Sequence, residues 1–347
     1  MSSATDPAPS EPLYPAYLPV RPEGFSATID VPPFDIVEPG SRADPAKPEI
    51  FTPTAQIQNI TRRIGTEIRG VQISQLSNEG LDQMALLAAE RGVLVFRDQD
   101  FKDIGPDRQR DIVGYFGPLH QHPTMGYPKG TGPEFQVVYA DEKVGNLRTL
   151  LGPRPTYDLW HIDQTFTPNT PSTTFFWTLE TPSHGGGDTA FTSLTAAYAA
   201  LSPTYRSTLH GLRLHHSSAS VGEVARVGQE RADKEAVKTT HPLVIRQPVT
   251  GLPALFVNPT IARGVVGCLR EESEVVLGFL NGHVRSLDFS CRVRWEGGTV
   301  VVWDQRTAAH SAVPDFDDGE RRHMVRMIPY GSIPQAAFPA ETKPEKA

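Results

Sequence analysis

The chain has 347 residues, of which 38% are hydrophobic and 21% charged, and its formal net charge is −7. A mildly acidic chain without long basic runs argues against nucleic acid or an anionic membrane as the main partner. The sequence has no apolar run of ~18 residues and no signal-peptide core, and its two cysteines are too few for a disulfide framework. We therefore expect a soluble protein of the cytoplasm.

The first 53 residues are rich in proline, with 12 of the 32 prolines of the chain. Proline fixes φ and removes an amide donor, so this stretch is predicted to be an extended arm. Such an arm could pack on the body or on a neighbouring subunit, which is compatible with a homodimer or a homotetramer. Residues 54–332 are expected to form one domain, and residues 333–347 a C-terminal tail.

Helix and strand patterns follow the arm. A hairpin or short strands around Gly65 and Gly70 are predicted for residues 60–76. Between Leu81 and Ala88 apolar side chains recur at the spacing of one helical face, with Asn78 as the expected N-cap and Gly92 as the expected end. A buried strand at 93–96 and a second helix at 106–116 come next.

The rest of the chain reads mainly as short strands separated by turn residues. They are predicted at 135–139, 173–178, 243–246, 255–258, 292–295, 299–303 and 324–328. Two helices interrupt them, at 195–210 and 270–287. Many short strands with turn signals favour an all-β sandwich or barrel, so we expect a β core with helices packed outside it.

The segment Trp160-His161-Ile162-Asp163 carries the first candidate for chemistry. On a strand, His161 and Asp163 would point to the same face. A second histidine, for which His310 is the candidate, would complete the two-histidine, one-carboxylate site of non-haem iron oxygenases. The alternative for each residue is an ordinary structural role.

Two arginines, Arg322 and Arg326, lie four residues apart on a predicted strand and so on one face. A guanidinium group binds a carboxylate or sulfonate through two parallel hydrogen bonds, so a buried pair would suit two anions. The alternative is a solvated basic edge paired with the acidic residues at 317, 318 and 320.

Two further motifs are less specific. Gly185-Gly186-Gly187-Asp188-Thr189 is expected between a strand and a short helix; it lacks the pattern of a nucleotide site, and a tight turn is the alternative. His120 and His122 could form a second metal pair, but one of them lining a pocket is the preferred interpretation.

Together these segments resemble the TauD/TfdA family of dioxygenases that depend on Fe(II) and 2-oxoglutarate. The matching pieces are FGPLHQHP (116–123), WHIDQTF (160–166), GGDTAF (186–191), ALFVN (254–258), TVVVWDQRTAAH (299–310) and RRHMVR (321–326). The arm and the piece VLVFRDQDF are similar to a fungal branch of sulfonate (taurine) dioxygenases. The resemblance implies a double-stranded β-helix, or jelly roll, as a single domain.

The resemblance also implies roles for residues at the metal. His161, Asp163 and His310 would hold Fe(II), with no catalytic residue beyond these ligands. Thr189 and Arg322 would hold the distal carboxylate of the cosubstrate 2-oxoglutarate.

For the substrate, the resemblance implies that Arg326 and His122 bind its anionic group. The chain departs from the taurine enzyme at Tyr157, where that enzyme has an asparagine, and at Ile162 and Gln164, which replace smaller residues. Tyr157 and Gln164 are therefore expected to shape a different pocket wall.

An enzyme of this kind would oxidise a C–H bond of a small anionic substrate, with succinate and CO2 as co-products and ascorbate as a stimulant. A sulfonate or alkyl sulfate would release sulfite or sulfate and leave an aldehyde. The first alternative is the same machinery acting on an amino acid or natural-product intermediate, by hydroxylation or ring closure. The second alternative is a non-catalytic jelly-roll protein that binds a metal or ligand.

Overall fold

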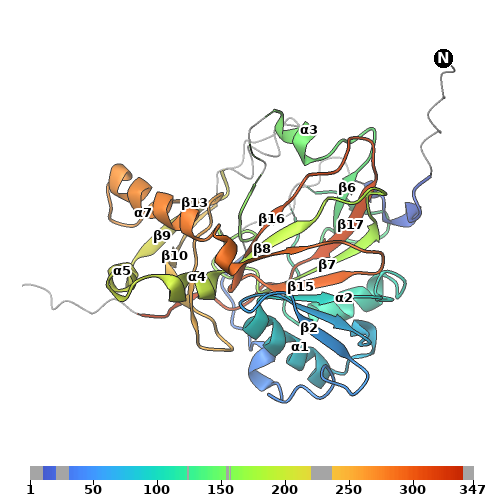
Figure 1. The fold of residues 1–347 in the computed structure, drawn as a ribbon, viewed down its shortest axis with the longest axis horizontal. Helices are drawn as coiled ribbons and strands as arrows, with labels where there is room; N and C mark the ends of the chain where they lie inside the picture. Colours follow the sequence, from blue (N-terminus) through green and yellow to red (C-terminus); the bar gives the residue numbers. More distant parts are fainter. Residues whose placement is uncertain are drawn as a thin grey trace, which may run out of the picture.

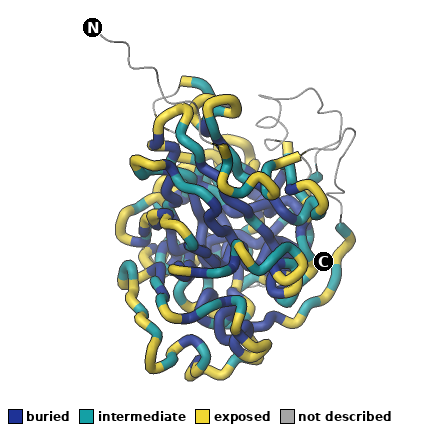
Figure 2. Tube along the Cα trace, turned by 90° about the vertical axis from the view of Figure 1, so that its right-hand side faces the viewer, coloured by how far each residue is buried: buried dark blue, intermediate teal, exposed yellow. Residues whose placement is uncertain are grey.

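Two β-sheets face each other at the centre of the molecule, and helices cover the outer face of the larger one (Figure 1). The computed structural model describes residues 11–20, 31–122, 125–153, 156, 158–219 and 237–338. Figure 2 shows that the buried backbone is concentrated in the middle of the molecule, with exposed turns around it.

The larger sheet has seven strands. In spatial order they are β2 (Gln56–Asn59), β3 (Thr66–Arg69), β4 (Val93–Phe96), β15 (Val300–Asp304), β7 (Thr173–Glu180), β17 (Arg322–Met327) and β6 (Gln136–Ala140). All neighbours in it run antiparallel except β3 and β4. Side chains alternate between its faces, so Val302 packs toward the helices while Val301 and Trp303 pack toward the smaller sheet.

The smaller sheet has three strands and closes the core from the other side. Its strands are β14 (Ser290–Val293), β8 (Thr189–Ser193) and β16 (Ala308–Ala312). Phe191 of β8 and Trp303 of β15 meet edge to face between the sheets, with ring centroids 5.3 Å apart. The predicted arrangement of short strands around a buried core is therefore present.

The outer face of the larger sheet is covered by α1 (Asn78–Arg91) and α2 (Pro106–Gly114). The N-cap of α1 is Ser77, whose Oγ accepts a hydrogen bond from the Gly80 amide at 3.2 Å, so the prediction of Asn78 was one residue late. Gly92 ends the helix as predicted, with a φ of 75° that favours glycine.

Three helices and two small three-stranded sheets lie beside the smaller sheet, and together they are called the second helical layer here. Its elements are α4 (Leu194–Ala200), α5 (Pro203–Leu209) and α7 (Arg270–His283), the strands β10 (Lys238–Pro242), β9 (Arg213–Ser217) and β13 (Ala262–Val265), and the strands β12 (Pro253–Leu255), β11 (Val244–Arg246) and β18 (Gln335–Ala336). The single helix predicted at 195–210 is two helices, because Ser202 caps a new helix that starts at Pro203. The helix predicted at 270–287 ends at His283, and the strand predicted at 255–258 does not extend past Leu255.

The described part of the arm lies along the body. Its strand β1 (Pro19–Val20) pairs with β5 (Tyr127–Pro128), and Glu38 forms a buried ion pair with Arg306.

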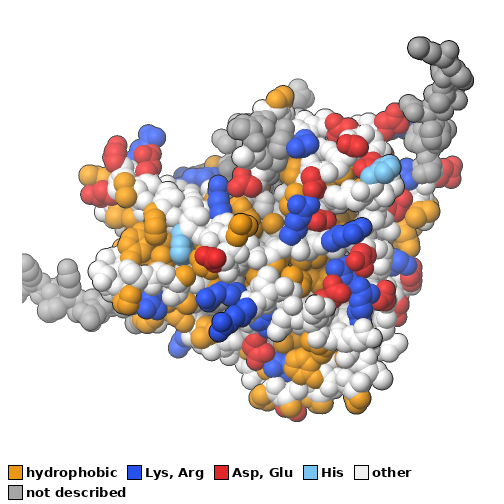
Figure 3. Space-filling view, viewed as in Figure 1, with side chains coloured by type: hydrophobic (Ala, Val, Ile, Leu, Met, Phe, Trp, Pro, Cys, Tyr) orange, Lys and Arg blue, Asp and Glu red, His pale blue; other side chains and the backbone are white. Residues whose placement is uncertain are grey.

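The remaining short elements are α3 (Leu147–Leu151) and the 3-10 turns η1 (Pro15–Tyr17), η2 (Pro39–Arg42), η3 (Ile73–Gln75) and η4 (Leu287–Phe289). Across the described residues, no helix has the length and apolar character needed to cross a membrane. Figure 3 shows lysine and arginine side chains interspersed with acidic ones on the face in view.

Candidate functional site

Three of the predicted residues meet at one point. His161, Asp163 and His310 each offer a ligand atom, and these atoms lie within 4.8 Å of one another. The two histidines are brought together by backbone pairing, because the amide of each donates to the carbonyl of the other at 2.9 Å. Asp163 lies in a turn after this isolated bridge, so the prediction of a regular strand at 161–163 was wrong although the two side chains converge.

Both imidazole rings are held so that a nitrogen faces Asp163. The Nδ1–H of His161 donates to the Leu159 carbonyl at 2.6 Å, and Nε2 of the same ring lies 3.6 Å from Asp163 Oδ1. His310 Nε2 lies 3.8 Å from Asp163 Oδ2. Burial, reinforced by the neighbouring His161, holds the pKa of His310 well below its ordinary value, so His310 is neutral.

Asp163 is charged although it is buried. Burial alone would raise its pKa, but Arg326 and the two histidines outweigh burial and hold the pKa well below the ordinary value. Its Oδ1 accepts from Arg326 Nη1 at 3.0 Å, and its Oδ2 accepts from Gln305 Nε2 at 2.5 Å. Two imidazoles and one carboxylate are the donor set that suits a divalent first-row metal with open positions, so the residues fit such an ion.

Both arginines of β17 face the space between the sheets. The register places Arg326 opposite Phe176, and the guanidinium of Arg322 lies 5.8 Å from the Phe176 ring centroid. Arg326 also receives support from β6, since its Nε donates to Gln136 Oε1 at 3.1 Å. Arg322 is 8% exposed and Arg326 is half-buried, so the alternative of a solvated basic edge is wrong.

Arg322 lies against the glycine-rich segment. Its Nε donates to the Gly187 carbonyl at 3.1 Å, and a Cβ on Gly187 would lie 2.9 Å from that same nitrogen. Thr189 is buried beside it and accepts from Trp295 Nε1 at 3.2 Å. The segment precedes strand β8 and not the short helix that we predicted. Burial lowers the pKa of Arg322 to about 10, so it is cationic at neutral pH.

The two histidines at 120 and 122 serve different contacts. His120 is buried and its Nδ1 lies 3.1 Å from Gln136 Nε2; burial and the charge of Arg326 lower its pKa to about 4. His122 Nδ1 accepts from the Met125 amide at 3.1 Å. Within the described residues neither histidine belongs to a group of three metal-ligand side chains, which does not support a second metal pair.

Gln164 and Tyr157 are the two remaining residues predicted for the pocket wall. Gln164 is buried directly after Asp163 with a φ of 45°, and its side chain interacts with that of the buried His120. Tyr157 lies outside the described residues.

Sequence reasoning missed three amides that hold this site: Gln305 on Asp163, Gln136 on Arg326, and Asn258, whose Nδ2 donates to the Ile162 carbonyl at 2.6 Å. All three are fully buried. A polar amide directly beside a buried strand is the signal that could have found them, because a buried amide needs hydrogen-bond partners.

Known proteins resemble this chain over most of its length. A family profile described as "Taurine catabolism dioxygenase TauD, TfdA family" matches residues 56–328. The chain is 41% identical to alpha-ketoglutarate-dependent dioxygenase cnsM of Penicillium expansum, covering 93% of this chain and 90% of the relative. It is 34% identical to an alpha-ketoglutarate-dependent sulfonate dioxygenase of Saccharomyces cerevisiae, covering 92% and 78%.

A solved structure has the same fold. The crystal structure of a taurine dioxygenase from Burkholderia xenovorans superposes with a TM-score of 0.67 at 28% identity, covering 82% of this chain and 92% of that one. The prediction of a mainly β jelly-roll core with flanking helices is confirmed by this likeness and by the two facing sheets.

Proposed function

Because the chain belongs to the TauD/TfdA dioxygenase family and is a 2-oxoglutarate-dependent non-haem iron dioxygenase, we propose that it oxidises a C–H bond of a small anionic substrate held by Arg326. The observation that carries this proposal is the position of Arg326, whose guanidinium lies 3.0 Å from Asp163. An anion bound by Arg326 would bring its neighbouring carbon atoms beside the metal ligands.

In this proposal His161, Asp163 and His310 hold the iron. When bound, the iron supplies dioxygen activation coupled to decarboxylation of 2-oxoglutarate to succinate and CO2. The protein would contribute two imidazoles and one carboxylate, which would leave positions open for cosubstrate and oxygen. Ascorbate is proposed to stimulate by keeping the iron in its ferrous form.

Arg322 and Thr189 hold the distal carboxylate of 2-oxoglutarate in this proposal. Among the described residues the side chain of Arg322 makes a hydrogen bond only through its Nε, which leaves both terminal nitrogens for a carboxylate. Burial would make this ion pair strong, because water is excluded from it.

The favoured substrate is a sulfonate or an alkyl sulfate, bound by Arg326 with help from His122, Gln164 and Tyr157. Hydroxylation of the carbon that bears the sulfonate yields a product that loses sulfite and leaves an aldehyde; an alkyl sulfate releases sulfate in the same way. The S. cerevisiae relative, whose name specifies sulfonates, supports this choice.

A second candidate substrate is an amino acid or natural-product intermediate, which would be hydroxylated or cyclised. Gln164 favours it. Its side-chain amide is buried directly after the proposed metal ligand Asp163, where it could exchange hydrogen bonds with an amino or carboxyl group of a substrate.

Succinate formation tests both candidates. Purified protein is incubated with Fe(II), ascorbate and 2-oxoglutarate across a panel of sulfonates, sulfate esters and amino acids, with sulfite and sulfate measured in parallel. Succinate matched by sulfite or sulfate is the expected result, whereas succinate coupled only to an amino acid would establish the second candidate. Omitting ascorbate tests its role, and no succinate with any substrate would contradict the proposal.

The organisation of the chain and its setting are also proposals. Residues 54–332 would form the catalytic unit, with residues 1–53 as an arm and 333–347 as a tail. Size-exclusion chromatography with light scattering tests the proposed homodimer or homotetramer. A fluorescent fusion tests the proposed cytoplasmic location.

A further inference from the structure

Gln305 contacts Asp163 at two places. Its Nε2 donates to Asp163 Oδ2 at 2.5 Å, and its Oε1 accepts from the Asp163 amide at 3.1 Å. One side chain therefore holds both the carboxylate and the backbone of the same residue. Asp163 lies in a turn and not on a strand, so no sheet pairing fixes its orientation. The two hydrogen bonds from Gln305 help to fix it instead.

Gln305 is itself held rigidly. Gln305 is fully buried, and its backbone amide donates to the Ser172 carbonyl at 2.8 Å. Its side-chain Nε2 also donates to Thr174 Oγ1 at 2.7 Å. Thr174 belongs to β7, an inner strand of the larger sheet, and Ser172 directly precedes that strand. The orientation of the Gln305 amide is therefore set by the core of the fold.

The residues on either side of Gln305 form a buried ion network. Arg306 Nη2 lies 2.8 Å from Asp304 Oδ2, and Arg306 Nη1 lies 2.6 Å from Glu38 Oε1 of the arm. Gln247 Nε2 donates to Asp304 Oδ2 at 3.0 Å. A buried ion network of this kind prefers one geometry, so it fixes the backbone on both sides of Gln305.

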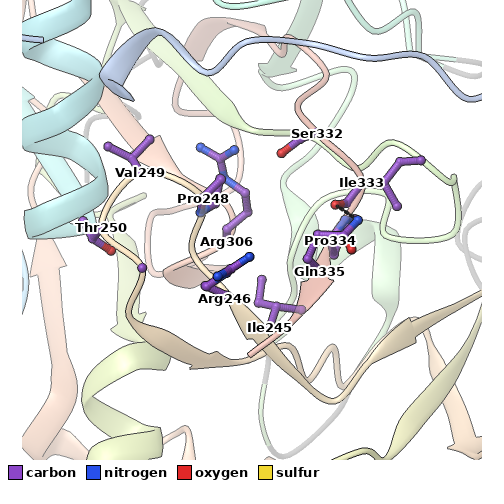
Figure 4. A pocket seen from close by; sticks show the side chains of 11 residues that line it. Ile245, Arg246, Pro248, Val249, Thr250, Arg306, Ser332, Ile333, Pro334 and Gln335 are labelled. Carbon is purple, nitrogen blue, oxygen red and sulfur yellow. Dashed lines mark hydrogen bonds between the residues drawn. The ribbon is translucent and has the colours of Figure 1, made fainter. Parts of the chain in front are cut away.

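The ion network also borders a cavity that the metal ligands do not line. Arg306 lines a cavity of about 490 Å³ together with Arg246, Ser332 and Gln335 (Figure 4). The residues that line this cavity include none of the three proposed metal ligands. Gln305 thus connects the metal ligand Asp163 to a rigid network that contains a residue of the arm.

We propose that Gln305 is a positioning residue that fixes the Asp163 carboxylate in the orientation in which it binds the metal. This inference rests on the proposed function, in which Asp163 is a metal ligand. Partners that orient a metal ligand typically change metal affinity by about 10- to 100-fold when they are removed. The loss is expected for Gln305 because a carboxylate with one fewer donor can rotate away from the two histidines.

Cobalt(II) binding to the purified full-length chain tests this proposal, with the visible absorption of the bound ion as the readout. Gln305→Met removes the amide at nearly constant volume and is expected to weaken cobalt affinity by about 10- to 100-fold and to change the absorption bands. Gln247→Met is the matched control, because it removes one buried amide bond to Asp304 without touching Asp163. The two bonds from Arg306 to Asp304, at 3.0 and 2.8 Å, keep the ion network beside Gln305 in place. Gln247→Met is expected to lower thermal stability and to leave the cobalt affinity and spectrum as in the wild type.

The outcomes separate three cases. If Gln305→Met and Gln247→Met lose similar stability and both keep the wild-type cobalt affinity and spectrum, the positioning role is wrong. If the wild type binds no cobalt, or binds it equally well after His161→Ala, the proposed metal site itself is wrong. Should Gln305→Met fail to fold, Gln305→Asn keeps the amide but is too short to hold both groups of Asp163, and wild-type cobalt affinity in that variant would overturn the proposal.

Discussion

Two buried polar regions attach to the same short turn, and they differ in charge. The charged region contains Asp163 with its partners Arg326 and Gln305. The neutral region contains Thr165, two residues further on, whose hydroxyl lies 2.7 Å from His216 Nδ1 and accepts from Asn258 Nδ2 at 2.9 Å.

The neutral region stays neutral because, within the part of the chain that the structure describes, no acidic group offsets its burial. Burial, with the neighbouring His241, lowers the pKa of His216 to about 3, and burial lowers the pKa of His241 to about 4. Asp163 is also buried but keeps its charge, because Arg326, His161 and His310 lie next to it. A buried charge is kept only where other charges and hydrogen bonds offset the loss of water. The charged region is thus suited to hold a metal and an anion, and the neutral region to hold the turn.

The strongest break in this comparison is a change in the charged region at His161. His161→Ala removes one of three proposed ligands, and we expect it to abolish succinate formation, a loss of at least about 1000-fold or ~4 kcal/mol in the barrier. Succinate measured with saturating 2-oxoglutarate checks this. Turnover that survives in His161→Ala would show that the metal is held elsewhere.

The second test separates the two arginines of the same strand. Arg326→Ala is expected to raise the KM of the primary substrate by about 100-fold (~3 kcal/mol) and that of 2-oxoglutarate much less, because a buried contact to the substrate anion is lost. Arg322→Ala is expected to do the reverse. Arg326→Lys serves as a control, since it keeps the charge beside Asp163 without the planar fork. Equal changes in both KM values would contradict this division of roles.

The third test acts on the neutral region through Asn258. Asn258→Ala leaves the Ile162 carbonyl and the Thr165 hydroxyl without a donor, and we expect a loss of ~3 kcal/mol in the free energy of unfolding. Asn169→Ala is the matched control, because the Nδ2 of Asn169 also donates two hydrogen bonds, to the carbonyls of Phe34 and Gly331. Chemical denaturation should show similar losses, whereas only Asn258→Ala should also reduce turnover. Equal turnover in the two variants would separate the neutral region from the site.

The smallest expected effect is the pH dependence of stability. The unfolded chain binds a proton at His216 below about pH 6.5, but the folded protein does so only near pH 3, so the free energy of unfolding falls as the pH drops through this window. Between pH 6.5 and pH 5 the loss is ~2 kcal/mol for this histidine. His216→Asn should flatten the wild-type curve over that range, measured by denaturation at each pH. Parallel curves for both proteins would show that His216 is not kept neutral by the fold.

The patterns of the chain predicted the elements of the fold better than their ends. The period of apolar residues in α1 and the β-branched run in β15 reflect local rules, so both were found. Ser77 was missed as the cap because serine and asparagine are both good N-caps and stand next to each other. The helix at 195–210 was not split because apolar periodicity hides a proline that can begin a new helix.

The proposed site divides in the same way. The pair His161 and Asp163 could be singled out by residue type and spacing, and resemblance added His310 from far along the chain. The strand geometry assumed for the pair was wrong, since Asp163 begins a turn that continues through Gln164, whose φ is 45°. A turn with a positive φ at a residue other than glycine is held by tertiary contacts, which spacing does not reveal.

The sequence by itself determined the chemical types at the site: two imidazoles, one carboxylate and two guanidinium groups, in segments with recognisable order. Only the tertiary structure decided which amides hold them, because Gln305, Gln136 and Asn258 act through contacts between distant segments. It also decided which buried groups carry charge. The pKa of a side chain depends on burial and on neighbouring charges, and both are set when the sheets and the second helical layer close around one turn.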